Sequence, residues 1–184
     1  MKKFEEKTIK TEQIFTGRMI DLSVDTVVLP DGTESTREIV NHPGAVAIIA
    51  ITDEGKIVVV EQYRKPLEKS LLEIPAGKLE PGENPVETAK RELEEETGYR
   101  ANRITYLTSS YTSPGFANEI LYFYLADQLT AVENGLQADD DEFVEVFEYT
   151  LEELAGFEKS QRIHDLKTSY AIQYLKLRND KGTF

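Results

Sequence analysis

Three glutamates near the end of a predicted helix are the residues best placed to do chemistry. The chain reads Arg-Glu-Leu-Glu-Glu-Glu-Thr-Gly over residues 91–98, which sets Glu92, Glu95 and Glu96 at i, i+3 and i+4. At this spacing three carboxylates share one helical face, where like charges repel at a cost of roughly 0.2–0.5 kcal/mol per pair. The last turns of a helix also favour cations over anions. A helix built for stability alone would not place its acids there, so the pattern indicates a cation site.

The net charge of the whole chain also indicates that bound cations are required. The sequence has 34 acidic and 21 basic residues, for a formal net charge of −13. This charge argues against general affinity for nucleic acid or anionic membranes, and a phosphorylated ligand would require local cations. All-carboxylate sites select hard cations such as Mg²⁺ or Mn²⁺, and two of them could bridge phosphate oxygens and activate water. The alternative is a solvated acidic face, which is the usual fate of glutamate-rich helices.

A capped helix and a turn-rich loop must position these acids. Asn84 suits the N-cap, Pro85 suits the first helical position, and Glu87 has the spacing of a capping box. The helix is expected to end at about Thr97, before Gly98. A loop rich in glycine and proline, residues 75–83, precedes it.

Apolar patterns elsewhere predict a sheet with helices packed on it. Residues 22–29 and 34–40 flank a Pro-Asp-Gly turn and are expected to form an antiparallel hairpin. Residues 45–51 are continuously apolar, as in a strand buried on both faces. The fold class is therefore α/β (α+β), a mixed sandwich. Further strands are expected at 56–63, 104–107, 119–126 and 143–149, then a helix with a capping box at Thr150 and Glu153, and a last amphipathic helix that directs Tyr170, Ala171, Tyr174, Leu175 and Leu177 to the core.

The segment that holds the glutamates resembles the signature sequence of the Nudix hydrolase family. Five residues separate Gly77 from Glu83, seven more lead to Arg91-Glu92-Leu93, and Glu95-Glu96 and Gly98-Tyr99 each follow after one residue. Every fixed position of the Nudix box is matched, over a motif long enough to make a chance match improbable. The resemblance implies a Nudix-type α/β/α sandwich with a mixed sheet, preceded by the antiparallel hairpin segment.

The resemblance also implies roles for the residues of the box. Glu92, Glu95 and Glu96 would be metal ligands, and Glu96 is counted among the catalytic residues. The Ala76 carbonyl is a further candidate ligand for Mg²⁺ or Mn²⁺. By the same likeness, Glu83 and Arg91 orient the acids, whereas Leu93 and Tyr99 belong to the core.

Segments outside the box indicate the substrate. Pro114, sixteen residues after Gly98, and the segments Arg37-Glu-Ile, Glu61-Gln-Tyr-Arg64 and Glu73-Ile-Pro-Ala-Gly resemble the ADP-ribose pyrophosphatases of Bacillus-like bacteria. This likeness implies Mg²⁺-dependent hydrolysis of ADP-ribose to AMP and ribose 5-phosphate. Arg64 would contact the phosphates, and Arg37 and Glu38 the adenosine end. The alternatives are surface ion pairs for the arginines and an ordinary turn at Pro114.

A general base is expected from an acidic loop after the box. Glu142 aligns best with a catalytic or metal-binding glutamate, and Asp140 with the neighbouring base. An aspartate at this place is one methylene shorter than the expected glutamate. Glu119, after the Ser-Pro-Gly loop, is another acid that could reach the substrate. The alternative is that residues 139–142 form a solvated acidic loop.

The chain is expected to have two parts, a β-rich dimerisation segment at 1–42 and a Nudix hydrolase domain at 43–184. In similar enzymes the first segment exchanges between subunits, so a swapped homodimer is expected, with Arg37 and Glu38 serving the neighbouring site. The sequence has no bilayer-length apolar run, no signal-peptide pattern and no cysteine. A cytoplasmic protein without nucleic-acid or membrane partners is therefore expected by default.

The sequence leaves two rival functions open. The substrate could be another nucleotide sugar, such as GDP-mannose or ADP-glucose, because box and fold would be the same. The chain could also be a non-catalytic ADP-ribose sensor. Sensors of this kind generally lose acids of the box and gain a DNA-binding segment, whereas here every acid is present and no basic helix is predicted.

Overall fold

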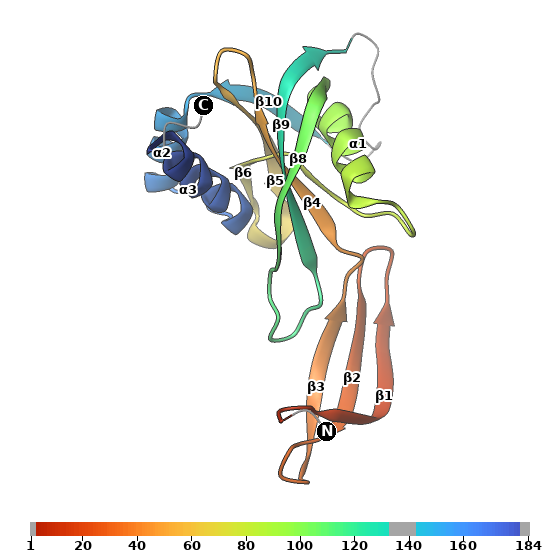
Figure 1. Ribbon diagram of the computed structural model, residues 1–184. Coiled ribbons are helices and arrows are strands. Elements are labelled where there is room, and N and C mark those ends of the chain that lie inside the picture. The colour runs from red at the N-terminus through yellow and green to blue at the C-terminus, as the bar shows by residue number, and fades with distance from the viewer. Residues whose placement is uncertain (1–2, 133–142, 181–184) are drawn as a thin grey trace. The chain divides into compact units, whose positions relative to one another are not determined.

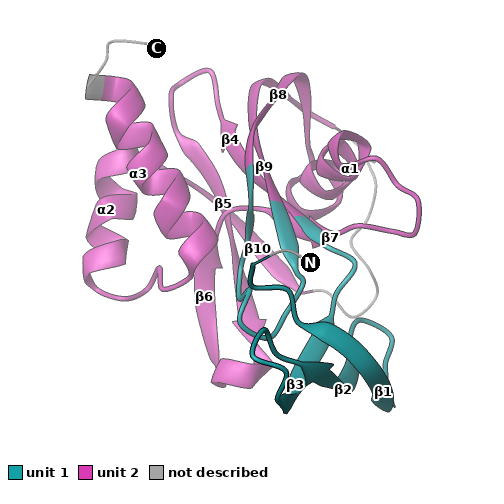
Figure 2. Cartoon of the chain, turned by 60° about the horizontal axis from the view of Figure 1, so that its bottom comes forward, with its two compact units in different colours: residues 1–45, 109–121 teal, residues 46–108, 122–184 magenta. Residues whose placement is uncertain are grey.

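The computed structural model describes residues 3–132 and 143–180 (Figure 1). The chain divides into two compact units (Figure 2). The first comprises residues 1–45 and 109–121, and the second comprises residues 46–108 and 122–184. No helix in the described ranges is long and apolar enough to cross a membrane.

The first unit contains a three-stranded antiparallel sheet. Its strands are β1 (Lys7–Thr16), β2 (Asp21–Val28) and β3 (Glu34–Asn41), in the order β1-β2-β3. The predicted hairpin is confirmed, since Val28 pairs with Glu34 across a turn in which Gly32 has a φ of 88°. Strand β1 was not predicted. All ten of its residues are exposed, so its sequence lacks the clear apolar alternation of a strand with one buried face.

The second unit is built around a mixed sheet. Its described strands follow the order β10-β5-β4-β9-β8, with β6 pairing with β5 and β7 with β4. The predicted strands are all present, and several extend further than expected, because pairing with a neighbour continues beyond the apolar run. The strands are β4 (Ala45–Ile51), β5 (Ile57–Arg64), β6 (Lys69–Glu73), β7 (Ala76–Lys78), β8 (Tyr99–Tyr111), β9 (Ile120–Ala131) and β10 (Val144–Tyr149), with a 3₁₀ turn at Lys65–Leu67.

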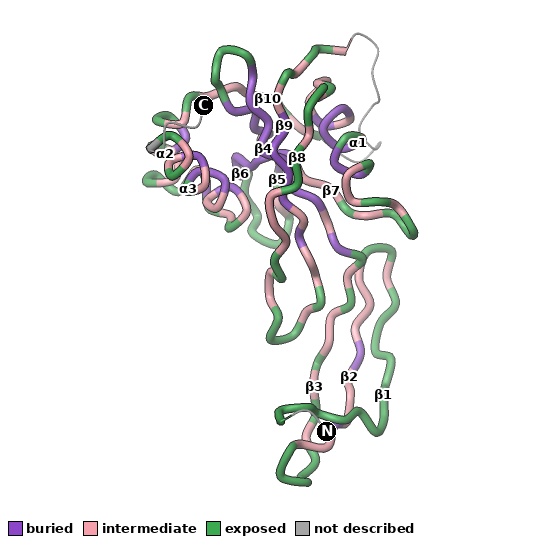
Figure 3. The backbone as a smooth tube through the Cα atoms, in the orientation of Figure 1, coloured by how far each residue is buried: buried purple, intermediate pink, exposed green. Residues whose placement is uncertain are grey.

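Strand β4 is buried on both faces, as its continuous apolar sequence predicted (Figure 3). Val46 and Ile48 pack in one cluster with Ala89 and Leu93 of α1 (Pro85–Thr97). The alternate residues face the other side of the sheet, where α2 (Leu151–Lys159) and α3 (Leu166–Asp180) lie (Figure 1). The helices thus enclose the sheet, and the predicted α/β/α layering is confirmed.

The helix ends agree with the capping signals, with one exception. Asn84 caps α1 by accepting a hydrogen bond from the Val86 amide at 3.1 Å, and the helix ends at Gly98, whose φ is 69°. The capping box expected at Glu87 is not formed, because this carboxylate pairs with Lys90 at 2.8 Å. The capping box of Thr150 and Glu153 in α2 is confirmed.

The last helix buries the expected stripe except at Leu177, since Tyr170 and Tyr174 are half-buried. Ala171 and Leu175 are buried as predicted, but Leu177 is 61 % exposed, so its assignment to the core was wrong. The buried positions Thr168, Ala171, Ile172 and Leu175 follow helical spacing. Leu177 lies about 200° around the helix from Leu175 and therefore faces away from the sheet.

Candidate active site

The glutamates of the box lie at the end of α1, beside the short strand β7, within the second unit. Glu92 and Glu96 are buried, with exposed fractions of 7 % and 4 %, and Glu95 is half-buried. The Ala76 amide donates a hydrogen bond to Oε2 of Glu96 at 3.0 Å. Burial of carboxylates is costly unless they are paired, hydrogen-bonded or bound to a metal ion. The site therefore holds its negative charge in a confined volume between helix and strand.

Gly77 owes its place in the box to the Glu92 side chain. A Cβ atom at this position would lie 1.8 Å from Cδ of Glu92 and about as close to both of its carboxylate oxygens. The backbone of Gly77 does not have a positive φ, so its torsion angles do not require glycine. Glycine is needed here for close approach, because any side chain would occupy the space of the Glu92 carboxylate.

Arg91 ties the loop before the helix to the acids of the helix. Its Nε and Nη2 donate to the two oxygens of Glu83, each at 3.1 Å. Its Nη1 donates to Glu92 at 2.9 Å and to Glu95 at 2.7 Å. The pKa of Arg91 is raised, chiefly by the hydrogen bond to Glu83. Arg91 thus links Glu83 of the loop to Glu92 and Glu95 of the helix.

The Glu83–Arg91 pair predicts a specific pH dependence of stability. The hydrogen bond from Arg91 lowers the pKa of Glu83 from 4.5 to about 2. A depressed pKa in the folded state adds stability that is complete above the unfolded-state pKa and is lost as the pH falls through the folded-state value. We therefore expect Glu83→Gln to lower the free energy of unfolding at neutral pH. The difference from wild type should vanish toward pH 2 in urea titrations; a difference independent of pH would contradict this pairing.

The donor set of the site suits a hard divalent cation. Glu92, Glu95 and Glu96 offer only oxygen, the kind of ligand that Mg²⁺ and Mn²⁺ prefer. Within the described residues, no three acidic or histidine side chains already converge as a metal cluster. Arg91 occupies one oxygen each of Glu92 and Glu95. Cation binding would thus exchange part of the Arg91 contacts for metal contacts, and the close approach that Gly77 allows keeps the Glu92 carboxylate against β7.

Arg64, the expected phosphate contact, lies at the end of β5 and is paired with Glu73. Its Nε and Nη2 donate to the two carboxylate oxygens of Glu73 at 2.8 and 2.7 Å. The pair raises the pKa of Arg64, and the nearby charges of Glu96 and Asp165 raise it further. Arg64 is therefore in the electrostatic neighbourhood of the box. Its side chain remains 39 % exposed.

Two residues at the start of α3 join this arrangement, and sequence reasoning missed both. Lys167 forms an ion pair with Glu73, and the Thr168 hydroxyl accepts a hydrogen bond from the Ile74 amide at 2.9 Å. A charged residue within the apolar run Leu-Leu-Glu-Ile was a signal for Glu73, because a buried acid requires a cation. Nothing in the sequence identified Lys167 as that cation.

Arg37 and Glu38 lie on β3 of the first unit. The Arg37 fork donates to both carboxylate oxygens of Glu6 at 2.7 Å, and its Nη1 donates to the Thr36 carbonyl at 2.9 Å. Glu38 is exposed and pairs in register with Val24. Arg37 is thus engaged in an ion pair within its own unit.

Pro114 and Glu119 lie in the loop that belongs to the first unit. Pro114 is exposed in a turn closed by the Phe116 amide, which donates to the Ser113 carbonyl at 3.1 Å. Glu119 accepts a hydrogen bond from the Thr112 hydroxyl at 2.5 Å, and its Oε1 lies 3.8 Å from Nδ1 of His42. Asp140 and Glu142, the candidate bases, lie outside the described residues.

Two apolar positions of the box, Leu93 and Tyr99, and the acid Glu94 have structural contacts. Leu93 is fully buried, as expected for core. Tyr99 is half-buried, and its hydroxyl donates to Glu148 of β10 at 2.5 Å, which raises the pKa of Tyr99 to about 12. Glu94, the remaining acid of this stretch, forms a bidentate pair with Arg100. Glu94 is therefore held apart from the metal-ligand candidates.

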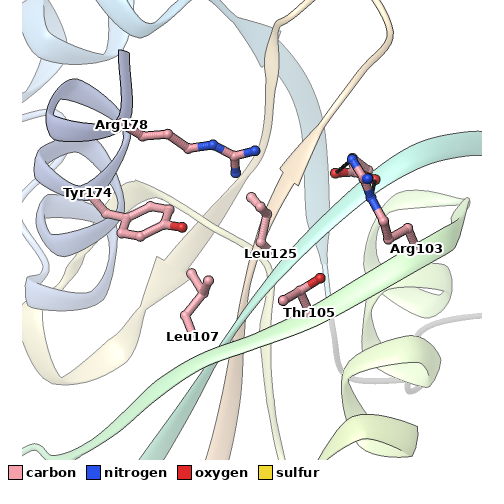
Figure 4. A pocket seen from close by; sticks show the side chains of 7 residues that line it. Arg103, Thr105, Leu107, Leu125, Tyr174 and Arg178 are labelled. Atoms are coloured by element: carbon pink, nitrogen blue, oxygen red, sulfur yellow. Dashed lines mark hydrogen bonds and ion pairs between the residues drawn. The ribbon is translucent and has the colours of Figure 1, made fainter. Parts of the chain in front are cut away.

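A separate pocket of about 420 Å³ lies between α3 and strands β8 and β9 (Figure 4). Tyr174 and Arg178 project from the helix toward Leu107 and Leu125 on the strands (Figure 4). No acid of the box lines this pocket, and Asp127 at its wall is paired with Arg103 at 2.6 Å. The candidate site for chemistry is accordingly the end of α1.

The chain matches known protein families and relatives over most of its length. The profile of the NUDIX domain matches residues 41–169, and the nucleoside diphosphate sugar hydrolase N-terminal domain matches residues 6–40. The chain is 59 % identical to an ADP-ribose pyrophosphatase of Bacillus subtilis (strain 168), over 97 % of this chain and 96 % of the relative. It is 62 % identical to a methanol dehydrogenase activator of Bacillus methanolicus, over 96 % of each.

A solved structure, described as an ADP compounds hydrolase, shares the fold. It superposes with a TM-score of 0.84, covering 98 % of this chain and 97 % of the other, at 20 % identity. That likeness supports the predicted fold, and the NUDIX profile covers well over half of the sequence. The chain therefore belongs to the Nudix family.

Proposed function

We propose that this protein hydrolyses the pyrophosphate bond of ADP-ribose, giving AMP and ribose 5-phosphate, with Mg²⁺ or Mn²⁺ as cofactor. The observation that carries the proposal is the group of buried glutamates at the end of α1 in a chain so similar to a named ADP-ribose pyrophosphatase. The excess of acids makes binding of two phosphates unfavourable without added positive charge. A cation held by the glutamate oxygens, together with Arg64, would supply this positive charge.

In this proposal, one group of residues binds the metal ion and another contacts the substrate. Glu92, Glu95 and Glu96, with the Ala76 carbonyl, would hold the cation, which when bound supplies positive charge and activates water. Arg91 and the Ala76 amide orient these carboxylates before the cation binds. Arg64 would contact the phosphates and stabilise the charge that develops on their oxygens. Glu142 or Asp140 would take the proton from water, and Arg37, Glu38, Pro114 and Glu119 would contact the rest of the substrate.

A panel of nucleotide sugars tests the substrate. We expect kcat/KM to be highest for ADP-ribose with Mg²⁺, lower for ADP-glucose and GDP-mannose, and abolished by excess EDTA. Restoring Mg²⁺ or Mn²⁺ should recover the rate, since the acids of the site cannot neutralise phosphate charge themselves. A higher kcat/KM for another nucleotide sugar would contradict ADP-ribose as the preferred substrate. Binding of ADP-ribose without turnover, in every metal tested, would favour the sensor.

We also propose a homodimer that exchanges the segment 1–42. Strand β1 is at the edge of its sheet and carries Ile9, Ile14 and Phe15, each at least half exposed. Exposed apolar side chains on an edge strand favour association with another chain. We expect a solution mass twice the 20.9 kDa of the chain, and a shift toward monomer for Ile14→Lys. Leu177→Lys, at an exposed leucine of α3, is the control; a wild-type mass of a single chain by light scattering would refute the dimer.

A second candidate function follows from the relative of Bacillus methanolicus. That relative is named a methanol dehydrogenase activator, so activation of a methanol dehydrogenase is a second candidate function of this chain, in addition to hydrolysis of free nucleotide. The two functions are separated by adding wild type or Glu96→Gln to a methanol dehydrogenase assay. Activation by wild type only would tie the effect to hydrolysis, and activation by both would assign it to binding.

A further inference from the structure

We infer that Lys167, in the first turn of α3, is a positioning residue that fixes Arg64 for the substrate by holding Glu73 between them; the inference rests on the proposed phosphate contact of Arg64. Lys167 has no place in the box and is distant from it in sequence. Its ammonium group nevertheless reaches the same carboxylate that grips the Arg64 fork. The contact therefore couples the last helix to the substrate-binding arginine.

Glu73 is the centre of this network. Its side chain is 3 % exposed, and both of its oxygens bind Arg64. Lys167 binds Oε2, the oxygen that also accepts from Nη2 of Arg64. Two cations from separate elements, strand β5 and helix α3, thus converge on one buried carboxylate.

The second cation keeps Glu73 ionised and in place. Burial acts to raise the pKa of Glu73, but the hydrogen bond from Arg64 and the charge of Lys167 outweigh it, so the pKa is lowered. A buried carboxylate with fewer partners is destabilised, because its remaining lone pairs lose hydration without replacement. Lys167 is only 14 % exposed and is itself held by Asp165 at 3.1 Å. The carboxylate therefore stays bidentate to Arg64.

The geometry at Arg64 explains why this matters for phosphate binding. With Nε and Nη2 committed to Glu73, the plane of the guanidinium is fixed. Within the described residues, Nη1 makes no hydrogen bond and is available to a ligand. Ile74, which follows Glu73, donates its amide hydrogen bond to Thr168, and Thr168 lies next to Lys167 in the first turn of α3. The start of α3 thus supports both Glu73 and the chain leading to Gly77.

A double-mutant cycle separates positioning from simple support of the fold. Lys167→Met keeps most of the side-chain length and removes the charge. We expect it to lower kcat/KM by about three- to thirtyfold, mainly through KM, and Lys167→Arg to restore most of the loss. In an Arg64→Ala background the same change should alter kcat/KM by less than about twofold, since Arg64 is no longer there to position. Mn²⁺ binding should be unchanged throughout.

Controls make each outcome decisive. Lys176→Met removes a lysine of the same helix, paired with Glu158 at 3.7 Å, and should leave kcat/KM unaltered. If Lys167→Met does not fold, Lys167→Gln, which retains a hydrogen-bond donor without the charge, replaces it. Additive losses in the cycle, or an unchanged KM in the single variant, would overturn the inference. Wild-type activity of Arg64→Ala would instead overturn the proposed role of Arg64. This single variant is one arm of the cycle, so the two failures can be distinguished.

Discussion

Replacement of Glu96 by glutamine is expected to lower kcat/KM by about 10²- to 10⁴-fold while the protein stays folded. Glu96 is the most buried of the three candidate ligands, and its Oε2 accepts the hydrogen bond of the Ala76 amide. A glutamine carbonyl can accept the same bond, so the contact between α1 and β7 survives. The carboxylate charge that would hold the cation does not survive. The loss should therefore fall on metal binding and turnover.

The stability of Glu96→Gln gives an independent test of the same idea. Without metal, wild type carries Glu92, Glu95 and Glu96 on one face at the end of α1, where both the helix dipole and mutual repulsion oppose them. We expect the metal-free variant to be as stable as wild type or more so. Excess Mg²⁺ should raise the melting temperature of wild type and leave that of the variant nearly unchanged. Near wild-type turnover in the variant would rule out Glu96 as a ligand.

Local sequence signals were enough to predict much of the architecture. The bounds of α1 followed from Asn84, Pro85 and Gly98, and β4 followed from its unbroken apolar run. Such signals act over one turn of helix or one strand, so they can be read without the rest of the fold. Strand β1 was not predicted and Leu177 of α3 was wrongly assigned to the core, because both depend on which neighbours the element meets.

The acidic residues of the candidate site could be predicted from the sequence, whereas the residues that hold Arg64 in place could not. The spacing of Glu92, Glu95 and Glu96 placed them on one helical face without tertiary information. The partners of Arg64 could not be found in this way, since Glu73 comes from β6 and Lys167 from α3. Ion pairs between residues far apart in sequence depend on topology, and one acidic residue among many in this chain gives no sign of its partner.

The requirement for glycine at residue 77 provides the sharpest structural test of the ligand role of Glu92. We expect Gly77→Ala to fold but to lose about 10- to 100-fold or more in metal affinity and in kcat/KM. The added Cβ would lie 1.8 Å from Cδ of Glu92, so one of the two must move. The Glu92 carboxylate is the end of a flexible side chain, whereas β7 is held by pairing with β4. The carboxylate is therefore the group that shifts.

Gly77→Ala is expected to weaken metal binding much more than it lowers the stability of the fold. This difference would show that the Glu92 carboxylate, and not strand β7, has moved. Displacing Glu92 weakens its 2.9 Å contact with Arg91, but Arg91 keeps its bonds to Glu83 and Glu95, and the move relieves part of the repulsion among the acids of α1. Thermal unfolding without metal should therefore change only modestly, while a Mn²⁺ titration should show the weaker site. A variant that unfolds outright would mean that β7, and not the carboxylate, absorbs the collision.

Gly156→Ala is the matched control for this substitution. Gly156 lies within α2, and a Cβ there meets nothing within 4 Å. Alanine in a helix is favoured over glycine, so this variant should keep full activity and gain about 0.4–1 kcal/mol of stability. If Gly77→Ala also retained its Mn²⁺ affinity and turnover, Glu92 would not be a metal ligand. The fixed glycine of the box would then serve the packing of β7 against α1 alone.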